Sequence, residues 1–315
     1  MKISVIGSGA MGSLFGGMLS ASGHEVVLFD IYQEHVDTVN SNGLSIESVV
    51  AENSIVHPFA SSKPEAVADS DIMIFFVKST VTRNAAEQFA PLAHSGTIAV
   101  TLQNGVGNEE ILRTVFGKEH TAAGVTSQGA TFIGPGRIRH AGSGPTYLCM
   151  SDGNNERLGP FLSALREAGF EGHAKDDIDN LIWSKLIINV GINALTALTG
   201  QTNGTLPEHS ETDELLVSLV EEAVAVTRKR GIELTYKDPV EAVRDVCKKT
   251  SANRSSMLQD FDRGKRTEID FINGAIVREA KRLGMEVPVN KTVTRLIQSL
   301  DRIHSSTTEK KEETQ

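Results

Sequence analysis

The strongest constraint on the fold is a glycine-rich segment near the start of the chain, Gly7-Ser8-Gly9-Ala10-Met11-Gly12, directly after the apolar run Ile3–Ile6. Three glycines with this spacing, between a buried strand and a helix, are typical of a unit that binds a dinucleotide. The first glycine makes a tight turn, the second lets the backbone approach a pyrophosphate, and the third lets the helix pack closely on the sheet. The helix N-terminus attracts the phosphates. We therefore expect all six residues to form a cofactor-binding loop.

A carboxylate, Asp30, follows the next expected strand, which ends in Val26-Val27-Leu28-Phe29. At this place a carboxylate accepts hydrogen bonds from the adenosine ribose hydroxyls and repels a 2′-phosphate. The residues just after it, Ile31, Tyr32 and Gln33, include no arginine. The pattern therefore predicts NAD or NADP as the cofactor, with NAD favoured.

Residues 1–176 alternate expected strands and helices. Apolar runs at residues 3–6, 26–29, 72–77 and 97–102 predict buried parallel strands, and helical patterns lie near residues 10–22, 33–40, 81–92 and 109–116. This order predicts an α/β fold, a doubly wound Rossmann domain with its ligand crevice at the carboxyl ends of the strands. Lys78 and Asn104 each follow such an end. Residues 138–150 alternate in polarity and predict an edge hairpin closing this domain.

From residue 177 the pattern becomes helical, which predicts an all-α C-terminal domain over residues 177–304. We expect helices at residues 181–198, 211–230, 239–247, 267–283 and 287–303. Residues 305–315 are polar, charged and without apolar anchors, and this composition predicts a disordered tail.

Bulk properties exclude several classes of function. The 315 residues carry a net charge of −9, which argues against binding nucleic acid. The two cysteines, Cys149 and Cys247, lie far apart and show no metal-ligand spacing, so we expect no metal site and a reducing compartment. The start of the chain enters a strand at once and no apolar run approaches the length of a membrane span. We expect a cytoplasmic protein that does not bind membranes.

The expected helix over residues 181–198 carries Lys185, Asn189 and Asn193 at spacings of four residues, which places them on one face. The rest of that helix is almost wholly apolar, and buried amides and ammonium groups are costly without partners. The stripe is therefore a candidate site, although a solvated polar face remains the alternative. Two more polar clusters, residues 253–260 and 267–274, have structural alternatives: serines and Thr267 often cap helices, and Glu268 suits a first helical turn.

Taken together, these motifs resemble the ketopantoate reductases (2-dehydropantoate 2-reductases) from residue 1 to about residue 300. The resemblance rests on the glycine loop, Val77-Lys78, Gln103-Asn104-Gly105, Trp183-Ser184-Lys185-Leu186 and Asn203-Gly204. Its most specific parts are the segments Ser255-Ser256-Met257-Leu258-Gln259-Asp260 and Thr267-Glu268-Ile269-Asp270 with Ile272-Asn273-Gly274.

The resemblance implies reversible hydride transfer between a nicotinamide and the C2 ketone of 2-dehydropantoate, giving (R)-pantoate for pantothenate and coenzyme A biosynthesis. It implies that Lys185 is the general acid and that Glu268 contacts the substrate hydroxyl or the cofactor. The implied substrate-binding residues are Asn189, Asn193, Asn203, Asn253, Ser255 and Ser256; the implied cofactor contacts are Lys78, Ala130 and Asn104, the last touching both ligands. Many relatives hold the 2′-phosphate of NADP with an arginine after the second strand, where this chain has Asp30-Ile31.

Two rival functions remain open. One is an NAD-dependent D-2-hydroxyacid dehydrogenase of the same fold that acts on a bulkier 2-oxo acid, although the paired Ser255-Ser256 suits the hydroxyl of ketopantoate. The other is a catalytically silent NAD-binding sensor, which we would expect to have lost Lys185 or Glu268. The apolar C-terminal helices suit a homodimer.

Overall fold

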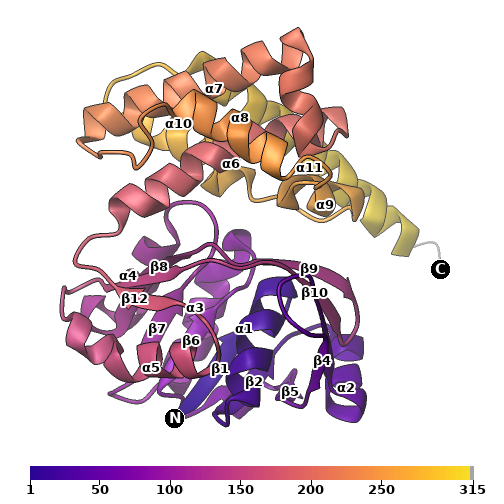
Figure 1. Cartoon of the computed structure of the whole chain (residues 1–315), viewed down its shortest axis with the longest axis vertical. Helices are drawn as coiled ribbons and strands as arrows, with labels where there is room; N and C mark the ends of the chain where they lie inside the picture. Colours follow the sequence, from indigo (N-terminus) through magenta and orange to yellow (C-terminus); the bar gives the residue numbers. More distant parts are fainter. Residues whose placement is uncertain (313–315) are drawn as a thin grey trace. The chain divides into compact units, whose positions relative to one another are not determined.

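The computed structural model describes residues 1–312, which divide into two compact units. Unit 1 holds residues 1–103 and 108–178; unit 2 holds residues 104–107 and the chain from Asp179 onward. Unit 1 is an α/β structure and unit 2 is helical (Figure 1). The predicted fold class, a Rossmann-like domain followed by an all-α domain, is therefore confirmed.

Unit 1 is built on a twisted eight-stranded sheet in the order β12-β11-β8-β7-β6-β1-β2-β5. The strands from β8 to β5 in this order are parallel, and β11 pairs antiparallel with β8. All four predicted strands are present in this sheet. The eight strands are β1 (Lys2–Ile6), β2 (Glu25–Phe29), β5 (Phe59–Ser61), β6 (Ile72–Phe75), β7 (Ile98–Thr101), β8 (Thr121–Thr126), β11 (Thr146–Met150) and β12 (Gly172–Ala174).

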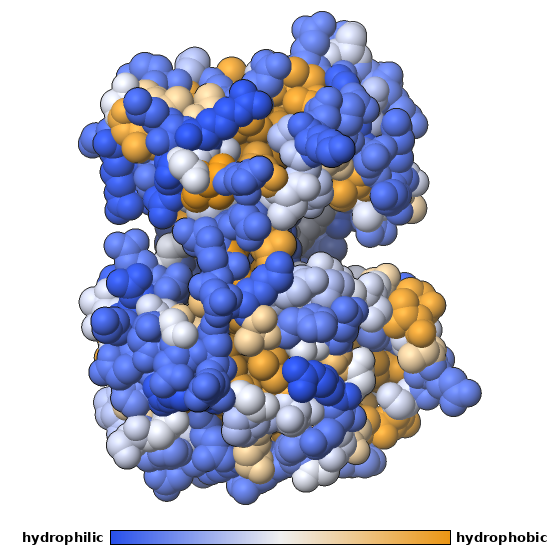
Figure 2. Space-filling model, turned by 60° about the vertical axis from the view of Figure 1, so that its left-hand side comes forward, coloured by the Kyte–Doolittle hydropathy of each residue, from blue (hydrophilic) through white to orange (hydrophobic). Residues whose placement is uncertain are grey.

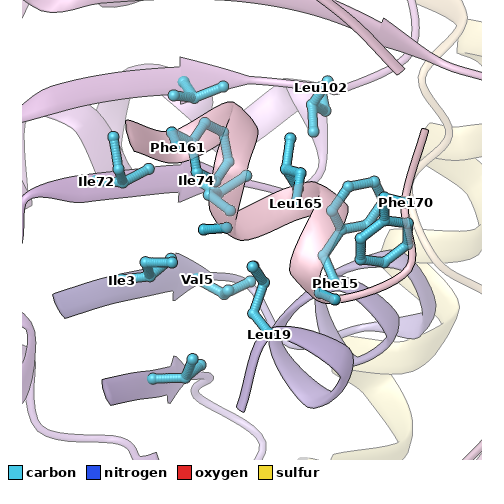
Figure 3. Close-up of a cluster of buried hydrophobic side chains, with 14 of the residues drawn as sticks. Ile3, Val5, Phe15, Leu19, Ile72, Ile74, Leu102, Phe161, Leu165 and Phe170 are labelled. Carbon is cyan, nitrogen blue, oxygen red and sulfur yellow. The ribbon is translucent and has the colours of Figure 1, made fainter. Parts of the chain in front are cut away.

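Successive side chains of the central strands enter two different apolar clusters, because side chains alternate between the faces of a sheet. Ile3 and Val5 pack with α1 (Ala10–Ala21) and α5 (Gly159–Glu167). Ile6 packs with α3 (Thr82–Phe89) and α4 (Asn108–Phe116) on the other face. Figure 3 shows the first cluster, in which the rings of Phe15 and Phe170 stack with centroids 4.3 Å apart. Helices on both faces make this sheet doubly wound.

A second, four-stranded sheet with the order β4-β3-β10-β9 was not predicted. Its strands are β3 (Leu44–Ser48), β4 (Ser54–Val56), β9 (Gly129–Gly134) and β10 (Arg137–Gly142), and α2 (Gln33–Asn42) precedes it along the chain. The predicted edge hairpin over residues 138–150 is wrong, since β10 belongs to this sheet and β11 to the large one. The link Ser143-Gly144-Pro145 carries the chain between the sheets; alternating polarity reveals a strand but not its partner.

Unit 2 is arranged around α6 (Asp179–Thr199), which packs against α7, α8, α9 and α11. Helix α6 is long and apolar enough to cross a membrane, contrary to the prediction that no apolar run approaches that length. However, 72% of its most apolar stretch is buried inside the structure, as in a core helix. Hydrophilic side chains cover most of the visible surface of each unit (Figure 2). The other helices are α7 (Ser210–Arg230), α8 (Pro239–Lys249), α9 (Ser256–Asp262), α10 (Asn273–Arg282) and α11 (Pro288–Glu312).

Two predictions about the C-terminal helices differ from the structure. The helix expected at 267–283 starts only at Asn273, because residues 269–271 form one 3₁₀ turn and Ile272, at φ −108° and ψ −96°, leaves the helical region. Helix α11 continues through Glu312, so residues 305–312 of the expected disordered tail are helical. Residues 313–315, the rest of that tail, lie outside the described residues.

Candidate active site

The glycine loop lies between β1 and α1 and leaves no room for side chains at two positions. Gly7 has φ +95°, and a Cβ there would lie 2.7 Å from the backbone nitrogen of Val77. A Cβ on Gly12 would lie 2.0 Å from the carbonyl oxygen of Gly7. Gly9 is the N-cap of α1, with no side-chain cap and no acidic residue in the first turn. A Cβ on Gly9 would meet nothing within 4 Å. Open space beside an uncapped helix N-terminus fits a pyrophosphate.

Asp30 follows β2 with its carboxylate held from two sides. Its Oδ1 accepts the backbone N–H of Tyr32 at 3.0 Å, and its Oδ2 accepts the hydroxyl of Ser8 at 3.3 Å. The second contact joins Asp30 to the glycine loop. The carboxylate therefore has a defined direction beside the loop, where the adenosine ribose of a dinucleotide lies in this fold.

The other two expected cofactor contacts in unit 1 come from different sheets. Lys78 follows β6, which pairs parallel with β1. It therefore lies at the carboxyl ends of the parallel strands, as the glycine loop does. Ala130 lies on β9 of the small sheet, opposite His140 of β10. Ala130 packs against the apolar cluster that also holds residues of α1.

The polar stripe of α6 lies in unit 2 as its spacing predicts. Asn193 is buried, with 5% of its surface exposed, and Lys185 and Asn189 are partly buried. None of the three residues is fully exposed, so the stripe is not an ordinary solvated face. One turn beyond the stripe, the hydroxyl of Thr196 donates to the Oγ of Ser255 at 2.7 Å and ties α6 to the start of α9.

The ammonium group of Lys185 is electrostatically perturbed. Desolvation by burial lowers the pKa of Lys185 from 10.5 to about 8, and the attraction of the Glu268 carboxylate opposes this shift. Glu268 itself is buried, with 7% of its surface exposed. A lysine near its pKa at working pH is suited to give up a proton, and its positive charge stabilises a developing oxyanion.

Asn104 belongs to unit 2 because its loop is fastened to the segment that carries Glu268. The backbone N–H of Val106 donates to the carbonyl of Phe271 at 3.0 Å, and the N–H of Phe271 donates to the carbonyl of Glu268 at 2.9 Å. Gly105 has φ +85°, and a Cβ there would lie 2.4 Å from the Phe271 oxygen. The close contact between the loop and Phe271 thus requires glycine after Asn104. The Phe271 carbonyl holds the loop that carries Asn104, and the sequence offers no signal for this contact.

The remaining expected substrate residues form one loop cluster. The backbone N–H of Asn203 donates to the carbonyl of Asn253 at 2.9 Å, and the buried Nδ2 of Asn203 donates to the Oγ1 of Thr250 at 2.9 Å. Ser255 is the N-cap of α9 and accepts the N–H of Leu258 at 3.1 Å. Asn253 and Ser256 are exposed. The structure therefore gives Ser255 the capping role that its sequence left open.

A buried aspartate that sequence reasoning missed holds the segment before Glu268. The Oδ2 of Asp301, on α11, accepts the hydroxyl of Thr267 at 2.8 Å, and both of its carboxylate oxygens lie 3.3 Å from the Thr267 N–H. Burial raises the pKa of Asp301. Thr267 therefore anchors this segment to α11 instead of starting a helix. Among the described residues, no group of three or more His, Cys, Asp or Glu is placed to hold a metal ion.

Comparison with known proteins gives matches along nearly the whole chain. The family models described as ketopantoate reductase PanE/ApbA and its C-terminal part match residues 3–153 and 177–301. The 2-dehydropantoate 2-reductase of Halobacterium salinarum is 34% identical over 96% of this chain and 99% of its own length. That of Archaeoglobus fulgidus is 34% identical over 95% of this chain and 98% of its own length.

Two solved structures resemble the chain as a whole. The PanE/ApbA family ketopantoate reductase from Ralstonia eutropha JMP134 has a TM-score of 0.88 at 34% identity, covering 97% of this chain and 100% of the other. A D-mandelate dehydrogenase in a ternary structure with NADH and anilino(oxo)acetate has a TM-score of 0.87 at 29% identity, with the same coverage.

Proposed function

This chain belongs to the ketopantoate reductase family, and on that premise we propose that it is a 2-dehydropantoate 2-reductase. The reaction reduces the C2 ketone of 2-dehydropantoate to (R)-pantoate, which leads to pantothenate and coenzyme A. The proposal rests on Lys185, which shares one face of α6 with Asn189 and Asn193. Burial lowers the pKa of Lys185 to about 8, and the charge of the buried Glu268 acts on its ammonium group.

When bound, the reduced nicotinamide supplies the hydride. Lys185 supplies the proton: as the ketone oxygen gains negative charge, its ammonium stabilises that charge and then protonates the oxygen. With a pKa of about 8, roughly nine-tenths of the lysine is protonated at pH 7. The lowered pKa also makes proton release easier than from an exposed lysine.

The amides around Lys185 are proposed to hold the substrate. Asn189 and Asn193 lie on its helix face, and Asn104 is fastened near Glu268. Amide and hydroxyl donors bind a small carboxylate without an arginine. From the loop cluster we assign Asn253 and Ser256 to the substrate, with Asn203 holding Asn253. We assign Glu268 to the substrate hydroxyl as acceptor.

We propose that the dinucleotide occupies the Gly7–Gly12 loop, with Lys78 and Ala130 as further contacts, and that NAD is preferred. The preference rests on Asp30, whose carboxylate is held by Ser8 and the Tyr32 N–H and would repel a 2′-phosphate. Asp30→Ala is expected to reduce discrimination against NADPH, measured as the ratio of kcat/KM for NADH and NADPH. A wild-type protein that already prefers NADPH would refute this assignment.

A second candidate is reduction of a bulkier 2-oxo acid. It is favoured by the likeness to a D-mandelate dehydrogenase that was solved with NADH, together with the carboxylate at Asp30. The same enzyme class would use Lys185 in the same way, so only the substrate separates the two candidates.

We also propose a homodimer in the cytoplasm. Support for the dimer comes from α11, where Leu296 and Ile303, seven residues apart on one face, are 49% and 57% exposed. Support for the reducing compartment comes from Cys149 and Cys247, which are both free thiols. Light scattering after gel filtration tests the dimer; a monomer mass at micromolar concentration would contradict it.

The function is tested by following oxidation of NADH and of NADPH with 2-dehydropantoate and with phenylglyoxylate. We expect turnover of 2-dehydropantoate; turnover of phenylglyoxylate alone would establish the second candidate instead. Lys185→Met is expected to lower kcat by at least about a hundredfold while NADH still binds. Lys248→Met, at an exposed lysine of α8, is the matched control and should leave kcat unchanged.

A further inference from the structure

A buried histidine of unit 1 is connected to the glycine loop by hydrogen bonds. His35, on α2, is 1% exposed, and its Nδ1 accepts the backbone N–H of Gly136 at 2.9 Å. A backbone N–H only donates, so Nδ1 is unprotonated and the neutral ring carries its proton on Nε2. Burial lowers the pKa of His35 and so favours the neutral ring, although the Asp30 carboxylate and a hydrogen bond to the Ser8 backbone both act to raise this pKa.

The protonated nitrogen of His35 is directed at α1. Its Nε2 lies 3.3 Å from the Oγ of Ser13, and the Ser13 hydroxyl donates to the carbonyl oxygen of Ser8 at 2.6 Å. Because Gly136 occupies Nδ1, Nε2 is the donor toward Ser13, and the serine hydroxyl keeps its own hydrogen for Ser8. The hydrogen bonds therefore all point one way, from Gly136 through His35 and Ser13 to the glycine loop.

The carbonyl at the end of this chain belongs to the Ser8–Gly9 peptide. The described peptide bonds include no cis bond, and in a planar trans peptide the C=O and N–H point in opposite directions. Holding the Ser8 oxygen toward Ser13 therefore directs the Gly9 N–H away from Ser13. Gly9 is also the position where an added Cβ would meet nothing within 4 Å. The loop is therefore open beside Gly9, where the phosphates of the proposed dinucleotide would lie.

We propose that His35 is a positioning residue for the dinucleotide: through Ser13 it fixes the Ser8–Gly9 peptide so that the Gly9 N–H is presented to the phosphates. This inference rests on the proposed dinucleotide binding at the Gly7–Gly12 loop. It adds to that binding a residue that does not itself touch the ligand.

A purely structural role is the competing explanation, since the His35 ring also packs 5.2 Å from the ring of Phe132. The two explanations differ at Ser13. If only packing matters, removing the Ser13 hydroxyl leaves His35 and Phe132 in contact and dinucleotide binding unchanged. If the hydrogen bonds position the loop, Ser13→Ala weakens dinucleotide binding although the ring stays in place.

The experiment measures the Kd of NADH by fluorescence titration of the full chain and of Ser13→Ala, His35→Phe and the double variant. We expect each single variant to bind NADH about five- to tenfold more weakly, the effect of one net hydrogen bond. The double variant should be no weaker than the weaker single variant, because both act through one carbonyl. His35→Gln, which keeps an N–H donor for Ser13, should recover part of the affinity. The kcat at saturating NADH and the KM for 2-dehydropantoate should stay unchanged.

The matched control is His120→Phe. His120 is a partly buried histidine that is hydrogen-bonded to the Thr97 carbonyl at 3.0 Å. Thr97 precedes β7 and therefore lies at the amino ends of the parallel strands, whereas the glycine loop lies at their carboxyl ends. Because His120 is thus far from the loop along the strands, its replacement should not change NADH affinity.

Wild-type affinity in Ser13→Ala, or additive losses in the double variant, would overturn the inference. Ser13→Ala decides the matter alone if His35→Phe does not fold. A wild-type protein that binds neither NADH nor NADPH would overturn both the inference and the proposed function. One that binds NADH but does not reduce 2-dehydropantoate would overturn only the proposed substrate.

Discussion

Replacing Lys185 by methionine should lower kcat by at least about a hundredfold and stabilise unit 2 at neutral pH. The pKa of Lys185 falls from 10.5 to about 8 on folding. At about 1.4 kcal/mol for each pKa unit, keeping the ammonium charged in the folded protein costs about 3 kcal/mol. Methionine has a similar length and no charge, so Lys185→Met removes this cost. The gain is an upper value, because the side chain is partly exposed.

The sign of the effect gives it a characteristic pH dependence. Because the folded pKa lies below the unfolded one, the unfolded state of the wild type binds more protons between pH 8 and 10.5. Its stability therefore rises across that range, whereas this contribution is missing from Lys185→Met. The variant should be more stable by about 3 kcal/mol at pH 7 and by only about 1 kcal/mol at pH 10.

Urea unfolding followed by tryptophan fluorescence measures this difference. Trp183 is the only tryptophan in the chain and is buried in unit 2, with 2% of its surface exposed. The cation of Arg230 lies 5.2 Å from the ring centre, so unfolding changes the surroundings of the fluorophore. Lys248→Met again serves as the control and should show no gain that disappears at high pH. If Lys185→Met is less stable than wild type at pH 7, or its gain is the same at pH 10, the desolvation argument is refuted.

Three further results are expected. The kcat for ketone reduction should fall above an apparent pKa of about 8, as Lys185 loses its proton; a flat profile to pH 10 would remove Lys185 as the acid. Gly105→Ala should destabilise unit 2 by about 1–3 kcal/mol and raise the KM for substrate, because its φ is +85° and its Cβ would meet Phe271; unchanged urea midpoint and KM would contradict this. Phe15→Ala should lower the free energy of unfolding by about 3–5 kcal/mol through loss of the stack with Phe170, measured by circular dichroism.

The features that could be predicted from the sequence are those whose cause is local. The turn at Gly7 and the face of α6 that carries Lys185, Asn189 and Asn193 follow from spacings of a few residues. Four strands of the large sheet, β1, β2, β6 and β7, were predicted for the same reason, whereas β5, β8 and β12 were not. Apolar runs bounded by turns are recognisable without knowledge of their partners.

The features that were missed depend on contacts between distant parts of the chain. Thr267 resembles a helix cap until Asp301, 34 residues later, is known to bind it. Phe271 gives no sign that its carbonyl receives the N–H of Val106. The predicted hairpin failed because its two strands do not pair with each other: β10 pairs with β9 and β3, and β11 pairs with β8 and β12. Local patterns carry no information about such partners.

Residues 104–107 belong to unit 2 although the chain on both sides of them belongs to unit 1, and this limits how the protein can be divided into fragments. The chain leaves unit 1 at Gln103, returns at Asn108 and leaves again after Ile178, so three covalent connections join the units. A gene divided at residue 178 would give two incomplete halves: the first carries a loop without its Phe271 acceptor, and the second lacks Asn104. Neither fragment would contain all residues of the proposed substrate site, so we expect substrate turnover only after the two fragments are recombined.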